Sequence, residues 1–243
     1  MVAAFVLMAV PAVAMGATLP LLLRALSVNE PVFGRALGRL YGWNTLGAVV
    51  GALAGEAILI PSLGVRGAGA LAGLLNLLAG AVAAFCGKRV LATPNPTVRE
   101  APRPLGATAI RLLFAAFLSG GAFLALEVVW FRFLLLFFSG TSLTFAIMLA
   151  VVLLGIAFGG LTASFGLKVN PEAHRLVCLA AAGAGAAVVL TYAGFSGALD
   201  PRPGQLIDEW AILRLSLVLM LPVSWLSGML FTLLGQSLSR TTS

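Results

Sequence analysis

Two charged residues, Glu127 and Arg132, lie inside the apolar segment LALEVVWFRFLLL. An ionisable group inside a membrane segment is costly and often functional, so Glu127 is a candidate for contact with a proton or a cationic solute. Five residues along one helix correspond to a rotation of about 140°, so we do not expect a direct ion pair between the two. Trp130 shares the helical face of Glu127 and offers a ring that packs over a cation. The alternative is structural: Arg132 extends to the membrane edge, and Glu127 forms a hydrogen bond within the protein.

A second carboxylate, Glu56, lies in the apolar run of residues 40–61. Near the middle of a membrane span it costs roughly 3 kcal/mol on insertion scales, so we expect it to face protein or water. Glu56 is a candidate proton or cation site, and the alternative is a neutral carboxyl group hydrogen-bonded to a neighbour. Asn44, near the start of the same run, is a candidate for a hydrogen bond across helices or for a helix cap.

Three glycines of the same run, Gly47, Gly51 and Gly55, recur at four-residue intervals. Such a stripe lets a second helix approach closely, so we predict that these residues pack against a helix and have no other role.

Catalytic motifs are missing from the sequence. It contains no P-loop, no HExxH, no GxSxG and no CxxC, so we assign no catalytic, cofactor-binding or metal-binding residue and do not expect an enzyme. The net charge of +7 does not indicate a nucleic-acid partner, because the basic residues form no cluster with interleaved aromatic residues. They flank the apolar runs instead, as in membrane proteins.

The elements that position these residues follow from the composition. Of 243 residues, 60% are hydrophobic and 9% are charged, and the mean hydropathy is +1.07. Soluble domains have about a quarter of their residues charged. The chain is therefore predicted to be an all-α integral membrane protein, with the lipid bilayer as its partner.

Apolar runs of about 20 residues are long enough to cross the bilayer as helices. We predict about seven such spans: residues 2–23, 40–61, 67–87, 110–137, 143–166, 175–195 and 211–235. With seven spans, eleven Lys and Arg residues fall on one side and three on the other, and Arg132 lies within the membrane. This bias predicts a multi-pass protein of the cell inner (plasma) membrane, with the N-terminus outside and the C-terminus in the cytoplasm.

A Pro-rich segment, residues 88–109, divides the chain. We interpret it as a cytoplasmic linker between the end of one helical repeat, residues 1–87 with three spans, and the start of a second, residues 110–243 with four spans. The first span, FVLMAVPAVAMGATLPLLLRALS, aligns without gaps with LVLMLPVSWLSGMLFTLLGQSLS at an offset of 212 residues. Two repeats of six helices are typical of major-facilitator transporters, so we expect an incomplete helical bundle of that kind.

Three strings, AMGATLPLLLRAL, GRLYGWNTLGAVVGALAG…LIPSLGVRG and FLSGGAFLALEVVWFRFLLLFFSGTSLTFAIMLAVVLLGIAFGG, resemble the membrane region of the fused spermidine synthases. In that family a major-facilitator-like membrane domain precedes a cytoplasmic aminopropyltransferase-like domain. The resemblance covers most of residues 10–165 and, weakly, the seventh span. Because the EVVWxR string occurs once, at Glu127 to Arg132, the resemblance implies that the chain begins at the fourth helix of the family's membrane domain and stops near the tenth. Glu56 departs from the family pattern.

The resemblance implies a non-catalytic membrane module of a spermidine-synthase-like protein. No synthase domain is found in this sequence, so aminopropyltransferase activity is not carried over to it. Such a module would anchor a cytoplasmic synthase domain or partner and would handle a polyamine or another cationic solute. The alternatives are a stand-alone proton-coupled transporter of small solutes and a structural membrane protein.

Overall fold

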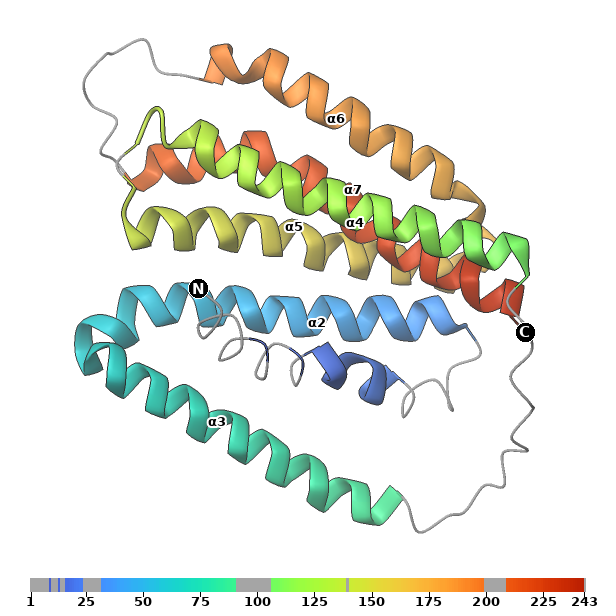
Figure 1. Ribbon diagram of the computed structural model, residues 1–243, viewed down its shortest axis with the longest axis horizontal. Coiled ribbons are helices and arrows are strands. Elements are labelled where there is room, and N and C mark those ends of the chain that lie inside the picture. Colours follow the sequence, from blue (N-terminus) through green and yellow to red (C-terminus); the bar gives the residue numbers. More distant parts are fainter. Residues whose placement is uncertain are drawn as a thin grey trace.

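A computed structural model describes residues 9, 13, 16–23, 32–90, 106–138, 140–198 and 209–242 (Figure 1). These residues form helices joined by short turns. The labelled helices are α2 (Phe33–Ala54), α3 (Ile60–Val90), α4 (Ala107–Leu134), α5 (Ser142–Val169), α6 (Val177–Ala198) and α7 (Glu209–Thr242). Within the described ranges, five helical segments are long and apolar enough to cross a membrane. The first predicted span, residues 2–23, and its proposed repeat relation to α7 lie largely outside the described residues.

The predicted second and third spans form one continuous segment, Phe33–Phe85, which is 53 residues long. It contains a sharp reversal at Gly64, whose backbone angles are φ 67° and ψ 172°. Glycine adopts a positive φ at little cost because it has no Cβ. Gly64 falls in the gap predicted between residues 61 and 67, and Figure 1 shows α2 and α3 leaving this turn in different directions.

Two helices, α5 and α7, form the centre of the bundle. α2 packs mainly on α5, whereas α4 and α6 pack mainly on α7. Small residues let α5 and α7 approach closely: a Cβ added at Gly155 would lie 2.5 Å from the Cβ of Ser224, and one at Gly228 would overlap the backbone of Ile156. The main apolar core lies between α4, α5, α6 and α7 and contains Trp130, Leu134, Met148, Leu215 and Leu219.

The prediction that Gly47, Gly51 and Gly55 pack against a helix stays a prediction, and the described residues supply no partner for them. A Cβ added at Gly47, Gly51 or Gly55 would meet nothing within 4 Å, so no helix of the described chain packs on this stripe. The contact is made instead by a second four-residue series, Gly34, Gly38 and Gly42. The two stripes lie on different sides of α2, because five residues separate Gly42 from Gly47 and turn the helix by about 140° relative to the first series.

Helices α2 and α7 meet near one end of the bundle and diverge toward the other. At the closed end, an added Cβ at Gly38 would lie 2.8 Å from Cγ2 of Thr232, and the rings of Tyr41 and Phe231 lie 4.8 Å apart between centroids. Further along α2, a pocket separates Val49 and Leu53 from the first turns of α7. Figure 1 shows the same divergence between the two ribbons.

Successive helices alternate in direction, so charged residues far apart in the sequence lie at the same end of the bundle (Figure 1). The two ends differ in the charged residues that they carry. One end, called here the cation-rich end, carries Glu172 and six basic residues: Arg35, Arg39, Arg111, Lys168, Arg175 and Arg240. The opposite end, called the acid-bearing end, carries Glu56, Glu209, Arg66, Arg132 and Arg214. Glu127 lies on α4 nearer the acid-bearing end.

The predicted division into two blocks stays a prediction. α2 belongs to the first block but packs on α5 and α7 of the second, so the two blocks share a contact surface. Most of the predicted linker lies outside the described residues. The helices shorten it at both ends, since α3 continues to Val90 and α4 begins at Ala107.

Candidate solute site

Trp130 is not placed to bind a cation in this structure. Its side chain is fully buried in the main apolar core. Its ring meets Phe123 edge-on, with centroids 6.2 Å apart and planes at 83°. A cation needs access to the face of the ring, and the Trp130 side chain has no exposed surface. Trp130 therefore serves as a core residue in this structure.

Glu127 and Arg132 lie in different surroundings on α4. Arg132 is exposed in the last helical turn, where a cation also interacts favourably with the helix C-terminus. Glu127 is half-buried and lines a cavity of about 20 Å³ together with Phe131, Phe145 and Met148. A cavity of this size has room for about one water molecule. Glu127 is thus placed to contact water or a proton, but the cavity is too small for a polyamine.

Glu56 lies eight residues before the Gly64 reversal, and its depth in the membrane stays a prediction. It belongs to a single π-helical turn, Gly55–Leu59, that follows α2. Its Oε1 accepts a hydrogen bond of 2.5 Å from the hydroxyl of Ser142, the first residue of α5. A carboxylate is stabilised at a helix N-terminus, where unpaired N–H groups create a partial positive charge. The geometry matches the structural alternative, a Glu side chain hydrogen-bonded to a neighbour.

Asn44 is exposed on α2, and it lies on the same side as the open glycine stripe. Position 44 is 11 residues into the helix that begins at Phe33, so Asn44 does not cap the helix start. The described residues bring Asn44 together with none of the acidic candidates.

An apolar pocket of about 260 Å³ lies where α2 and α7 diverge over α5; we call it the rim pocket. Its walls are formed by aliphatic side chains from three helices, and one acidic and one aromatic residue complete it. The lining residues are Val49, Leu53, Ile147, Ala150, Val151, Leu154, Glu209, Trp210, Leu213 and Leu217.

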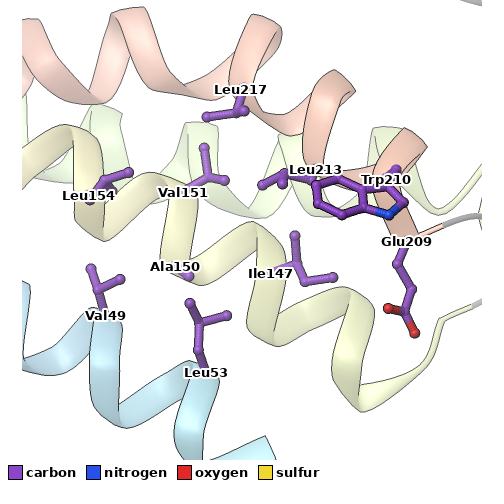
Figure 2. A pocket seen from close by; sticks show the side chains of 10 residues that line it. All are labelled: Val49, Leu53, Ile147, Ala150, Val151, Leu154, Glu209, Trp210, Leu213 and Leu217. Carbon is purple, nitrogen blue, oxygen red and sulfur yellow. The ribbon is translucent and has the colours of Figure 1, made fainter. Parts of the chain in front are cut away.

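Figure 2 shows how the polar side of the rim pocket is arranged. Glu209 and Trp210 are consecutive residues at the start of α7, and their side chains leave the helix in different directions from the same rim. The indole ring lies beside Leu213, over the apolar wall, and the carboxylate extends from the edge of the pocket. Both side chains are exposed. The pocket therefore combines an apolar interior with a negative charge at its mouth.

Sequence reasoning missed Glu209 as a site residue. The seventh span is predicted over residues 211–235, so Glu209 falls outside it. The helix in fact begins at Glu209. A signal was present: Trp210, Leu213 and Leu217 are spaced by three and four residues, which places them on one face of a helix.

A second and larger cavity, of about 440 Å³, lies between α4, α6 and α7. None of the described residues that line it is charged, and the hydroxyl of Ser119 already donates a hydrogen bond to the carbonyl oxygen of Ala116. This cavity offers no feature that selects a cation.

Metal binding has no support in the part of the chain that the structure describes, where no three His, Cys, Asp or Glu side chains lie close enough together to hold an ion. Comparison of the chain with protein-family models finds no matching family, and comparisons with curated proteins and with solved structures find no significant match. The resemblance to the fused spermidine synthases therefore stays an expectation from the sequence.

Proposed function

We propose that this chain is a non-catalytic helical membrane module that binds a cationic solute at its acid-bearing end. The observation that carries the proposal is the rim pocket: an apolar slot between α2, α5 and α7 with the Glu209 carboxylate at its mouth. Binding sites for small molecules are mostly apolar, with a few polar groups that select the ligand. A carboxylate and an indole at the rim select for positive charge.

The proposed orientation places the cation-rich end in the cytoplasm and the rim pocket toward the outside. Its support is the gathering of Lys and Arg at one end of the bundle, since cytoplasmic loops carry an excess of these residues. In this orientation a solute enters the rim pocket from the outer aqueous phase. A cytoplasmic synthase domain or partner would lie at the opposite end, as the resemblance to the fused spermidine synthases implies.

A proton-coupled transporter is the second candidate, and the position of Glu127 favours it. A half-buried carboxyl group beside a cavity of about 20 Å³ is arranged to exchange a proton with a single water molecule. Proton-dependent solute flux that is lost in Glu127→Gln and kept in Glu209→Gln would favour this candidate over the binding module.

Equilibrium binding to the full chain in lipid nanodiscs tests the first proposal. Labelled putrescine, spermidine and hexyltrimethylammonium are offered separately, and we expect at least one of these cations to bind. Glu209→Gln should weaken the binding by about fivefold, because a partly exposed ion pair contributes about 1 kcal/mol.

The matched control is Glu172→Gln. Glu172 forms an exposed ion pair of 3.1 Å with Arg175 at the opposite end of the bundle, so its neutralisation should leave cation binding unchanged. Absence of binding by all three cations, or equal losses in the two variants, would contradict the proposal.

A further inference from the structure

We propose that the rim pocket takes an organic cation with one positive charge and an apolar tail, and that it excludes polyamines. The inference rests on the proposed function and names the class of solute. It follows from the juxtaposition of the Glu209 carboxylate with walls that, within the described part of the chain, are otherwise aliphatic and aromatic.

The volume of the rim pocket suits a tail of several carbon atoms. An apolar cavity of about 150 Å³ in another protein holds a benzene molecule. The rim pocket, at about 260 Å³, is larger and is lined mainly by Val, Leu, Ile and Ala side chains. Transfer of an apolar tail from water into such a pocket is favourable in proportion to the apolar surface that it buries.

The charges of a polyamine do not match this lining. Its ammonium groups are separated by only a few methylene groups, so a polyamine cannot fill the pocket without carrying a second ammonium group inside. Among the lining residues that the structure describes, Glu209 is the one acidic residue. A buried ammonium group without a partner is strongly unfavourable. Polyamine entry is therefore opposed by the same walls that favour an alkyl tail.

The shape of the bundle fixes the direction in which the ligand lies. The backbone N–H of Gly34 donates a hydrogen bond to Oε1 of Gln236 at the closed end of the α2–α7 contact. Glu209 and Trp210 lie at the diverging end of the same two helices. The tail therefore points toward the closed end, and the cationic head group stays at the rim beside the carboxylate and the indole.

Three probes of graded charge test the inference in nanodiscs of zwitterionic phosphatidylcholine: hexyltrimethylammonium, spermidine and neutral hexanol. We expect hexyltrimethylammonium to bind at least tenfold more tightly than spermidine. Glu209→Gln should weaken its binding by about fivefold and leave the weak binding of hexanol unchanged.

A pair of neighbouring substitutions on α2 shows whether the ligand occupies the rim pocket. Leu53→Trp fills the pocket, because Leu53 lines it, and should weaken hexyltrimethylammonium binding at least tenfold. Val50→Trp is the matched control: Val50 is 66% exposed and is not among the lining residues, so binding should be retained.

The outcomes separate the inference from the proposed function. Tight spermidine binding that Leu53→Trp abolishes would overturn the inference while the proposed function stands. Equal effects of Leu53→Trp and Val50→Trp would also overturn it, because the cation would then lie elsewhere. Failure of every cation to bind would end both proposals.

Discussion

The backbone N–H of Gly34 donates a hydrogen bond of 2.5 Å to the side-chain oxygen of Gln236, a residue 202 positions later in the chain. Gly34 lies in the first turn of α2, where N–H groups have no partner within the helix. Val32, which precedes that helix, provides no side-chain cap. Gln236 on α7 supplies the missing acceptor and so joins the two helices at the closed end of their contact.

Gln236→Leu should lower the free energy of unfolding by about 1–3 kcal/mol, because it leaves the buried Gly34 N–H without an acceptor. Thermal unfolding in detergent, followed by circular dichroism, measures the change. Ser237→Ala is the control, since the Ser237 hydroxyl bonds to Leu233 of its own helix and should contribute little. Equal stability of the two variants would show that the Gly34–Gln236 bond does not hold α2 and α7 together.

The two glycine stripes of α2 should respond differently to the same substitution. An added Cβ at Gly38 would lie 2.5 Å from the carbonyl oxygen of Gly160, so Gly38→Ala should cost about 1–3 kcal/mol of stability through overpacking. No described residue lies within 4 Å of a Cβ added at Gly51, so Gly51→Ala should be neutral or stabilising by up to about 1 kcal/mol, because Ala favours the helix more than Gly does. The same unfolding measurement compares them, and a loss in Gly51→Ala as large as that in Gly38→Ala would contradict the packing described.

Glu56 should act in stability and not in solute binding. Glu56→Ala removes the acceptor of the Ser142 hydroxyl and a negative charge beside the N-terminus of α5, so we expect a loss of about 1 kcal/mol. Affinity for hexyltrimethylammonium should stay unchanged in the nanodisc assay. Ser142→Ala removes the donor of the same hydrogen bond, so it should also lower the stability. If Glu56→Ala lowered the affinity for the cation without lowering the stability, Glu56 would be a solute-binding residue, as the sequence suggested.

The helical class and the reversal at Gly64 were accessible from the sequence, because both depend on local features. Long apolar runs require helices in a bilayer, and the gap between residues 61 and 67 contains the glycine whose positive φ breaks the helix. These features do not depend on which helix lies beside which.

The sequence does not predict which face of each helix packs against its neighbours. Gly34, Gly38 and Gly42 have the same four-residue spacing as Gly47, Gly51 and Gly55, and only the packing of α2 on α5 and α7 distinguishes the two series. Trp130 illustrates the same limit, since its spacing from Glu127 cannot reveal that its ring is enclosed by the core. Glu209 was missed because the pocket it completes is assembled from helices distant in sequence.

The central claim is that the chain spans the membrane with its acid-bearing end and rim pocket facing outward. Labelling of cysteines at the two ends of the bundle tests it most directly. Single cysteines are introduced at two exposed valines, Val65 beside the Gly64 turn and Val169 at the end of α5, in a background with Cys86→Ala and Cys178→Ala. A membrane-impermeant maleimide should label Val65→Cys in intact cells. It should label Val169→Cys only after the membrane is permeabilised. Labelling of both cysteines in intact cells, or the reverse pattern, would contradict the account.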